Sequence, residues 1–174
     1  SSDLEGQQKL VSELAKTGKP VIALVMCGRP VIFNEIREHA DAVLCTWWLG
    51  SEAGNAICNV LWGEYNPSAK LPMTFPAHVG QIPIYYQNKS TGRPTALKQT
   101  YKASYIDAST EPAYPFGYGL SYTDFGYSDL KLLPGKAAGV HTEVSVKVTN
   151  TGKCAGEEVV QLYVQDKVAS VTRP

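Results

Sequence analysis

The chain has 174 residues, 44% of them hydrophobic and 10% aromatic, so it can bury one good core or form one domain and part of another. Its 16 Lys and Arg balance 16 Asp and Glu, which argues against nucleic acid or anionic lipid as a partner. The longest apolar runs are strand-sized, and the amino end lacks the pattern of a signal peptide. We expect no membrane span, a neutral partner, and any export signal to lie upstream or to have been removed.

The first part of the chain alternates predicted helices and strands. Residues 3–17 place four apolar side chains on one helical face, and Gly18 follows as a stop. These four residues are Leu4, Leu10, Val11 and Leu14. Residues 21–27 are apolar on both faces, as in a parallel strand that helices cover. A polar helix over 34–39 and a second all-apolar strand over 42–48 then complete the pattern of an α/β layer.

The next helix is predicted to begin after Ser51, as its N-cap, and to end at Gly63. Its predicted packing face consists of Ala53, Ile57, Val60 and Leu61. Residues 71–76, LPMTFP, are predicted to form a short strand with prolines near both ends, which suits the edge of a sheet. Residues 87–113 have no apolar period, and a polar segment of that length is usually functional or disordered.

Residues 114–125, YPFGYGLSYTDF, concentrate aromatic side chains in an irregular stretch with no charge before Asp124. Wide, flat side chains can fill the boundary between two layers at little cost in conformational entropy. We predict that this run joins the α/β layer to a β domain, with Tyr114, Phe116 and Tyr118 largely buried. The alternative is an exposed platform on which a sugar stacks.

Beyond the aromatic run the apolar period changes to that of a strand. Residues 127–133, 141–152 and 157–166 are predicted to form three antiparallel strands. A closed β-sandwich of this kind needs about seven strands. We therefore expect half of a sandwich.

Five stretches in order resemble the carboxy-terminal region of the family 3 glycoside hydrolases, especially the bacterial β-glucosidases. They are TGKPVIALVMCGRPV, ADAVLCTWWLGSEAGNAICNVLWGEYNPSAKLPMTFP, VGQIPIYYQNKSTGRP, YPFGYGLSYTDF and VTNTGKCAGEEVVQLYVQDKVASVTRP. The resemblance covers essentially the whole chain. Each stretch alone is a weak signal, but five in the family's order and spacing are a strong one.

The resemblance implies an α/β fold class with a particular order of domains. An (α/β) sandwich domain over residues 1–113 is expected, then an aromatic connection over 114–126, then a truncated fibronectin type III-like β-sandwich over 127–174. It also implies that the amino-terminal (β/α)8 barrel is lacking. In this family the nucleophilic Asp is carried on that barrel, and in bacterial members like this one the acid/base Glu lies in a loop before residue 1. We expect no catalytic residue within the chain.

The activity implied is that of a retaining, exo-acting β-glucosidase that removes terminal β-D-glucosyl residues without metal or cofactor. The chain alone is expected to be inactive. Expected partners are a β-linked glucoside or oligosaccharide and the barrel, with a second copy of the chain as a further candidate, and the expected location is periplasmic or secreted. The alternative function is a non-catalytic carbohydrate-binding or interaction module.

Several local residues invite a chemical role. Glu52 is the strongest local candidate for a catalytic acid. The alternative is a structural role, because a carboxylate in the first turn of a helix complements the helix dipole. Arg29 follows a strand where open α/β sheets usually bind ligands, or else holds a turn. Trp47 and Trp48 could stack on a sugar, but at least one of them is expected in the core because they end a buried strand.

The polar segment offers the predicted substrate contacts. Arg93, Tyr101, Tyr105 and Asp107 combine aromatic rings with hydrogen-bonding groups, which suits a sugar subsite. The other interpretation is a contact with the barrel or a second subunit.

The four cysteines show no CxxC and no metal-ligand spacing with histidine, so no metal site is predicted. We interpret them as buried or half-buried thiols. Cys27 and Cys45 end strands that could be neighbours, which leaves a disulfide between them open.

Overall fold

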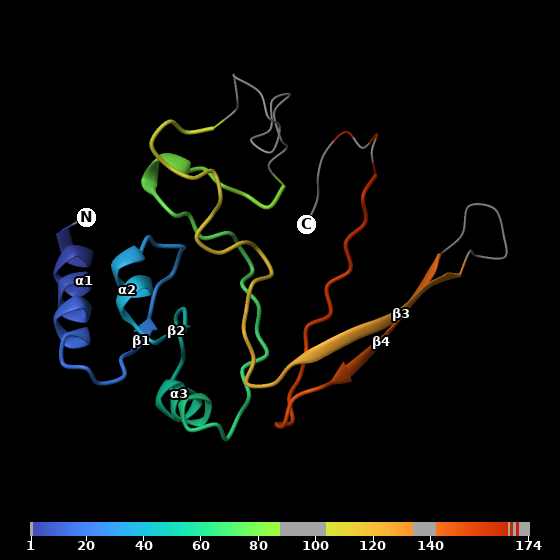
Figure 1. Cartoon of the computed structure of the whole chain (residues 1–174), viewed down its shortest axis with the longest axis horizontal. Helices are drawn as coiled ribbons and strands as arrows, with labels where there is room; N and C mark the ends of the chain where they lie inside the picture. The colour runs from blue at the N-terminus through green and yellow to red at the C-terminus, as the bar shows by residue number, and fades with distance from the viewer. Residues whose placement is uncertain (1, 88–103, 134–141, 167, 169, 171–174) are drawn as a thin grey trace. The chain divides into compact units, whose positions relative to one another are not determined.

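The computed structural model of the chain describes residues 2–87, 104–133, 142–166, 168 and 170. Figure 1 shows the helices and strands along the chain. Contacts between residues divide the chain into two compact units. The first unit comprises Ser1–Glu52, Leu71–Tyr118 and Tyr163–Pro174, and the second comprises Ala53–Lys70 and Gly119–Leu162. Each unit draws on separate parts of the chain, and the domain boundaries at 113 and 127 stay a prediction.

The first unit contains the predicted α/β alternation. Helix α1 (Ser2–Ala15) precedes Gly18, whose φ of +71° suits the end of a helix. Strand β1 (Ile22–Val25) and strand β2 (Ala42–Cys45) pair in parallel, and helix α2 (Asn34–His39) connects them. Both strands are shorter than predicted. None of the helices that the structure describes is long and apolar enough to cross a membrane.

The core of the first unit lies on one face of the β1–β2 sheet. Its buried members are Val25, Cys27, Phe33, Ile36 and Phe75. Val11 of α1 packs against this cluster, but Leu10 and Leu14 are 59% and 45% exposed, so the predicted packing face of α1 is only partly correct. The opposite face of β1 is open: Ile22 is 51% exposed and Leu24 is 40% exposed. The expectation that helices cover both faces does not hold for these residues.

The aromatic run contacts this core through Tyr114. Its ring lies 6.0 Å from that of Phe33 and 4.9 Å from that of Tyr118. Phe75 and Tyr114 form an isolated antiparallel bridge. The strand predicted over 71–76 is therefore reduced to this single pair of residues. Tyr114 and Phe116 are half-buried, but Tyr118 is 38% exposed, so its predicted burial is wrong.

The second unit contains helix α3 (Ala53–Leu61) and a two-stranded antiparallel sheet. In α3 the four residues of the predicted packing face are half-buried and the other five are exposed. The helix begins two residues after Ser51, so Glu52 is the residue that directly precedes it. Strand β3 (Phe125–Leu133) pairs with strand β4 (Glu143–Asn150) in the register Tyr127 to Val148.

The third predicted β strand is absent from the described residues 157–166, which have no strand hydrogen bonding. Leu162 and Val164 on that stretch are 64% and 86% exposed. Alternating side chains favour an extended backbone, but a strand also requires a neighbour that accepts and donates its backbone hydrogen bonds. The predicted strand pairing is therefore wrong for these residues.

Candidate binding pocket

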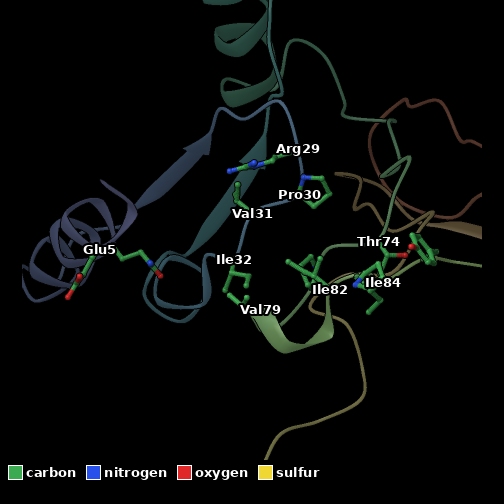
Figure 2. Close-up of a pocket in the computed structure, with 13 residues that line it drawn as sticks. Glu5, Arg29, Pro30, Val31, Ile32, Thr74, Val79, Ile82 and Ile84 are labelled. Carbon is green, nitrogen blue, oxygen red and sulfur yellow. The ribbon is translucent and has the colours of Figure 1, made fainter. Parts of the chain in front are cut away.

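The described part of the first unit contains a pocket of about 740 Å³ beyond the carboxyl end of β1 (Figure 2). One wall is the segment from Arg29 to Ile32, and the other is formed by Val79 and the segment from Ile82 to Tyr85. The remaining lining residues are Glu5, Gln8, Thr74 and Pro76. Segments far apart in the sequence thus build one concave surface.

The chain reaches this pocket because β1 ends at the core. Val25 and Cys27 are buried, and the chain then passes through exposed Gly28 and Arg29 before Phe33 returns to the core. Arg29 therefore lies where the sequence placed it, on the segment that leaves a parallel strand, and its side chain is exposed along the pocket (Figure 2).

The pocket is largely aliphatic with a few polar groups. Ile32, Val79, Ile82 and Ile84 provide apolar surface, while α1 contributes Glu5 and Gln8 from a separate element (Figure 2). Small-molecule sites commonly combine an apolar lining with a few polar groups that set orientation. This composition can therefore bind an apolar surface that carries hydroxyl or anionic groups.

The described lining of the pocket offers fewer carboxyl groups than retaining glycoside hydrolysis requires. That reaction requires two carboxyl groups about 5–5.5 Å apart, one as nucleophile and one as acid. Among the described residues that line the pocket, Glu5 offers a single carboxyl group.

The polar segment is only partly described. Arg93 and Tyr101 lie outside the described residues, and Asp107 is exposed. The Tyr105 hydroxyl donates to the Gly80 carbonyl at 3.0 Å, and its ring meets that of His78 edge-on with centroids 5.0 Å apart. Because its proton is already engaged, Tyr105 could offer a sugar only its ring and its oxygen lone pairs.

Gln81 anchors the segment that carries Tyr105. It lies in the 3-10 helix Val79–Gln81 and is 3% exposed. Its side-chain amide nitrogen donates to the carbonyls of Ser109 at 3.2 Å and Glu111 at 2.9 Å, and its oxygen accepts from Ala77 N at 2.6 Å. Sequence reasoning missed this residue, since a single glutamine in a turn has no periodic signal.

The other candidate residues lie apart from the pocket lining. Glu52 is exposed, directly before α3. Trp47 is half-buried and packs edge-on against Phe75 at 5.7 Å, whereas Trp48 is 74% exposed. In the part of the chain that the structure describes, no three His, Cys, Asp or Glu side chains gather as a metal site would require.

Comparison with known proteins identifies relatives along nearly the whole chain. The sequence profile of the Glycosyl hydrolase family 3 C-terminal domain matches residues 1–122. The chain is 48% identical over 173 residues to the periplasmic beta-glucosidase of Salmonella typhimurium, covering 98% of the chain and 23% of that relative. It is also 48% identical to a beta-xylosidase of Formosa agariphila, again over 98% of the chain and 23% of the relative.

Solved structures agree with these sequence matches. The beta-glucosidase of Listeria innocua, in complex with isofagomine, superposes with a TM-score of 0.89 at 41% identity. The match covers 98% of this chain and 24% of that one. The chain therefore spans about a quarter of the length of the proteins it resembles.

Proposed function

The chain belongs to the family of glycosyl hydrolase family 3 C-terminal domains, and from this premise we propose that it is part of a retaining, exo-acting β-glucosidase. The observation that carries the proposal is 48% identity over 98% of the chain to a protein named a beta-glucosidase. The proposed substrate is a β-linked glucoside or oligosaccharide, from which the whole enzyme removes a terminal glucosyl residue.

We further propose that the catalytic carboxylates are supplied by chain outside these 174 residues. The relatives are about four times as long, which leaves room for a (β/α)8 barrel as the partner of this region. The described pocket supports the proposal that the catalytic carboxylates lie outside these residues, because its lining has one carboxyl group and the reaction needs two. The chain alone would then bind without turnover.

The proposed architecture is an (α/β) sandwich domain over 1–113 and a truncated fibronectin type III-like β-sandwich over 127–174. The parallel β1–β2 pair supports the first, and the antiparallel β3–β4 pair supports the second. A second copy of the protein is a candidate partner. A periplasmic or secreted location is proposed because the Salmonella relative is named periplasmic.

Arg93, Tyr101, Tyr105 and Asp107 are proposed to contact the sugar in the whole enzyme. The support is chemical: a phenol ring, a guanidinium and a carboxylate are groups that stack on a sugar and hydrogen-bond its hydroxyls. Asp107→Asn and Tyr105→Phe would separate a role in binding from a role in holding the segment. If the side chain contacts substrate, its substitution should raise KM. If it only holds the segment in place, its substitution should lower the melting temperature instead.

The decisive experiment is an assay of the whole protein that contains this chain. We expect hydrolysis of an aryl β-D-glucoside, with the glucose first released as the β-anomer in an NMR time course. The 174-residue chain, assayed beside it at equal concentration, should show no turnover. Release of the α-anomer would contradict the retaining mechanism.

A β-xylosidase is the second candidate, because a relative of that name is equally identical to the chain. An aryl β-D-xyloside in the same assay decides between them through the ratio of kcat/KM for the two sugars. A whole protein that turns over neither compound but binds oligosaccharides would instead indicate the non-catalytic module.

A further inference from the structure

Cys27 and Cys45 both lie at the carboxyl end of the β1–β2 sheet, with Cys27 two residues beyond Val25, the residue that pairs with Cys45. The register pairs Val25 with Cys45, and just beyond it Thr46 N donates to Val25 O at 3.0 Å. Alternate residues of a strand share a face, so Cys27 follows Val25 onto the core face. The burial agrees, because Cys27 is 8% exposed and belongs to the core cluster, against which Cys45 packs.

The two side chains are close enough to influence each other's ionisation. The pKa of the Cys45 thiol is raised to about 11, chiefly because burial disfavours the thiolate and secondly because of the neighbouring Cys27. A disulfide requires β-carbons about 3.5–4.5 Å apart and α-carbons about 4.4–6.8 Å apart, with the two side chains directed toward each other. The strand pairing holds Cys45 opposite Val25, and Cys27 follows two residues after β1 at the same end of the sheet.

We propose that Cys27 and Cys45 form a modification site, at which a small organic disulfide oxidises the two neighbouring thiols to an intrachain disulfide. The bond would tie the carboxyl ends of β1 and β2 together. Because Arg29 follows Cys27 by two residues, the same bond would restrain the segment that forms one wall of the pocket.

The reaction is a pair of thiol–disulfide exchanges. Cys45 is the less buried of the two, so its thiolate attacks one sulfur of the small disulfide and displaces the other sulfur as a thiolate. The Cys27 thiolate then attacks Cys45 Sγ in this mixed disulfide and releases the second small thiol. Two electrons pass from the cysteines to the small disulfide, and the two thiol protons pass to solvent and to the released thiolates.

The high pKa of Cys45 makes the first step slow at neutral pH. Since the thiolate is the attacking species, the rate of oxidation should rise about tenfold for each unit of pH between 7 and 9. The equilibrium position, in contrast, depends on how closely the folded chain holds the two sulfur atoms together.

The test uses the 174-residue chain with Cys58→Ser and Cys154→Ser, so that Cys27 and Cys45 are the remaining thiols. The chain is equilibrated with reduced and oxidised dithiothreitol at pH 8.5, quenched in acid, alkylated and analysed by mass spectrometry. The same equilibrium is measured in 8 M urea. We expect the disulfide to be favoured on the order of 100-fold more in buffer than in urea, as chain entropy gives for a loop of this size.

A matched control moves one thiol along the same strand. Val43→Cys combined with Cys45→Ser places the second thiol opposite Ala23, one alternate position further from Cys27. Its ratio between buffer and urea should be close to one. The proposal is overturned if the Cys27 and Cys45 ratio is below about ten, or if the control chain reaches the same ratio.

Discussion

Phe75 and Tyr114 exchange two backbone hydrogen bonds, from Phe75 N to Tyr114 O at 2.8 Å and from Tyr114 N to Phe75 O at 3.3 Å. Phe75 is 1% exposed and lies edge-on to Phe33 at 5.9 Å. The bridge thus joins the first residue of the aromatic run to Phe75, the most buried of the core residues that the structure describes. This contact ties the start of the irregular stretch to the core.

Phe75→Ala should lower the free energy of unfolding of the chain by about 3–5 kcal/mol, the usual cost of removing a core phenylalanine. Phe75→Leu refills most of the space and should cost about 1–2 kcal/mol. Urea denaturation followed by circular dichroism measures both. Equal losses for the two variants would contradict the assignment of Phe75 to the centre of the core.

Phe116→Ala should cost less, about 1–2 kcal/mol, because Phe116 is half-buried and its ring meets that of Tyr86 at 5.0 Å in a tilted pair. If the ring instead served as a sugar platform, the melting temperature would stay unchanged and glucoside affinity would fall. Thermal melting and glucoside titration of the whole enzyme distinguish these outcomes.

The helices were predictable because their signal is local. The four partly buried residues of α3 repeat with the helical period, and that period is visible without knowledge of any partner. The parallel pairing of β1 and β2 followed from two all-apolar runs separated by a helical stretch. The prediction of a strand over 157–166 was wrong, because a strand must pair with a neighbouring strand and the sequence pattern does not identify that neighbour.

The pocket could be predicted only in part. Arg29 was placed beyond a strand end by a general rule of α/β sheets. Ile84 and Glu5, which share the pocket lining with it, carry no sequence signal that links them to Arg29. Such contacts arise from the course of the backbone, which the sequence pattern does not reveal. The hydrogen bonds from Gln81 to the carbonyls of Ser109 and Glu111 could not be predicted for the same reason.

Gln81→Leu should destabilise the chain by about 2–4 kcal/mol, because it leaves the Ala77 N–H and two carbonyl oxygens without their partner in a buried site. Gln81→Glu keeps the shape but places a carboxylate against two carbonyls, so its pKa in the folded chain should exceed the ordinary value of about 4.3. A raised folded pKa gives stability that is present below pH 4 and lost as the pH rises. Urea titrations of this variant at pH 4 and pH 7 should therefore differ more than those of the unaltered chain.

Lys70 and Glu158 form the least exposed ion pair among the described residues, with 13% and 15% of their side chains exposed and Nζ and Oε2 3.4 Å apart. Glu158 also accepts from the Tyr127 hydroxyl at 2.9 Å. Glu158→Gln should cost about 2–4 kcal/mol, because it leaves a mostly buried ammonium without its counter-charge. Adding Lys70→Met should recover part of that loss, and a double-mutant cycle measures the coupling.

The exposed pair Glu13 and Lys16 supplies the control for that cycle. Its side chains are 54% and 68% exposed although the ion pair is shorter, at 2.7 Å. Its coupling should be about 0.2–0.5 kcal/mol, as for other pairs on helix surfaces. A coupling between Lys70 and Glu158 that is no larger would show that burial does not strengthen the pair.

The reduced chain should lose stability between pH 9 and pH 11 through Cys45. Its pKa rises from 9.0 to about 11 on folding, chiefly because burial disfavours the thiolate. A raised folded pKa means that the stabilisation is complete below pH 9 and disappears as the pH rises through 11. Because the side chain is partly exposed, solvent screening should reduce the effect to about 1 kcal/mol.

Urea denaturation in the presence of a phosphine reductant, compared between the unaltered chain and Cys45→Ala, isolates this loss from the titration of the tyrosines. Parallel stability curves for the two chains across this range would contradict it. In the absence of the phosphine, a small organic disulfide that oxidises Cys27 and Cys45 to a disulfide should abolish the loss in the unaltered chain, because a disulfide has no proton to lose.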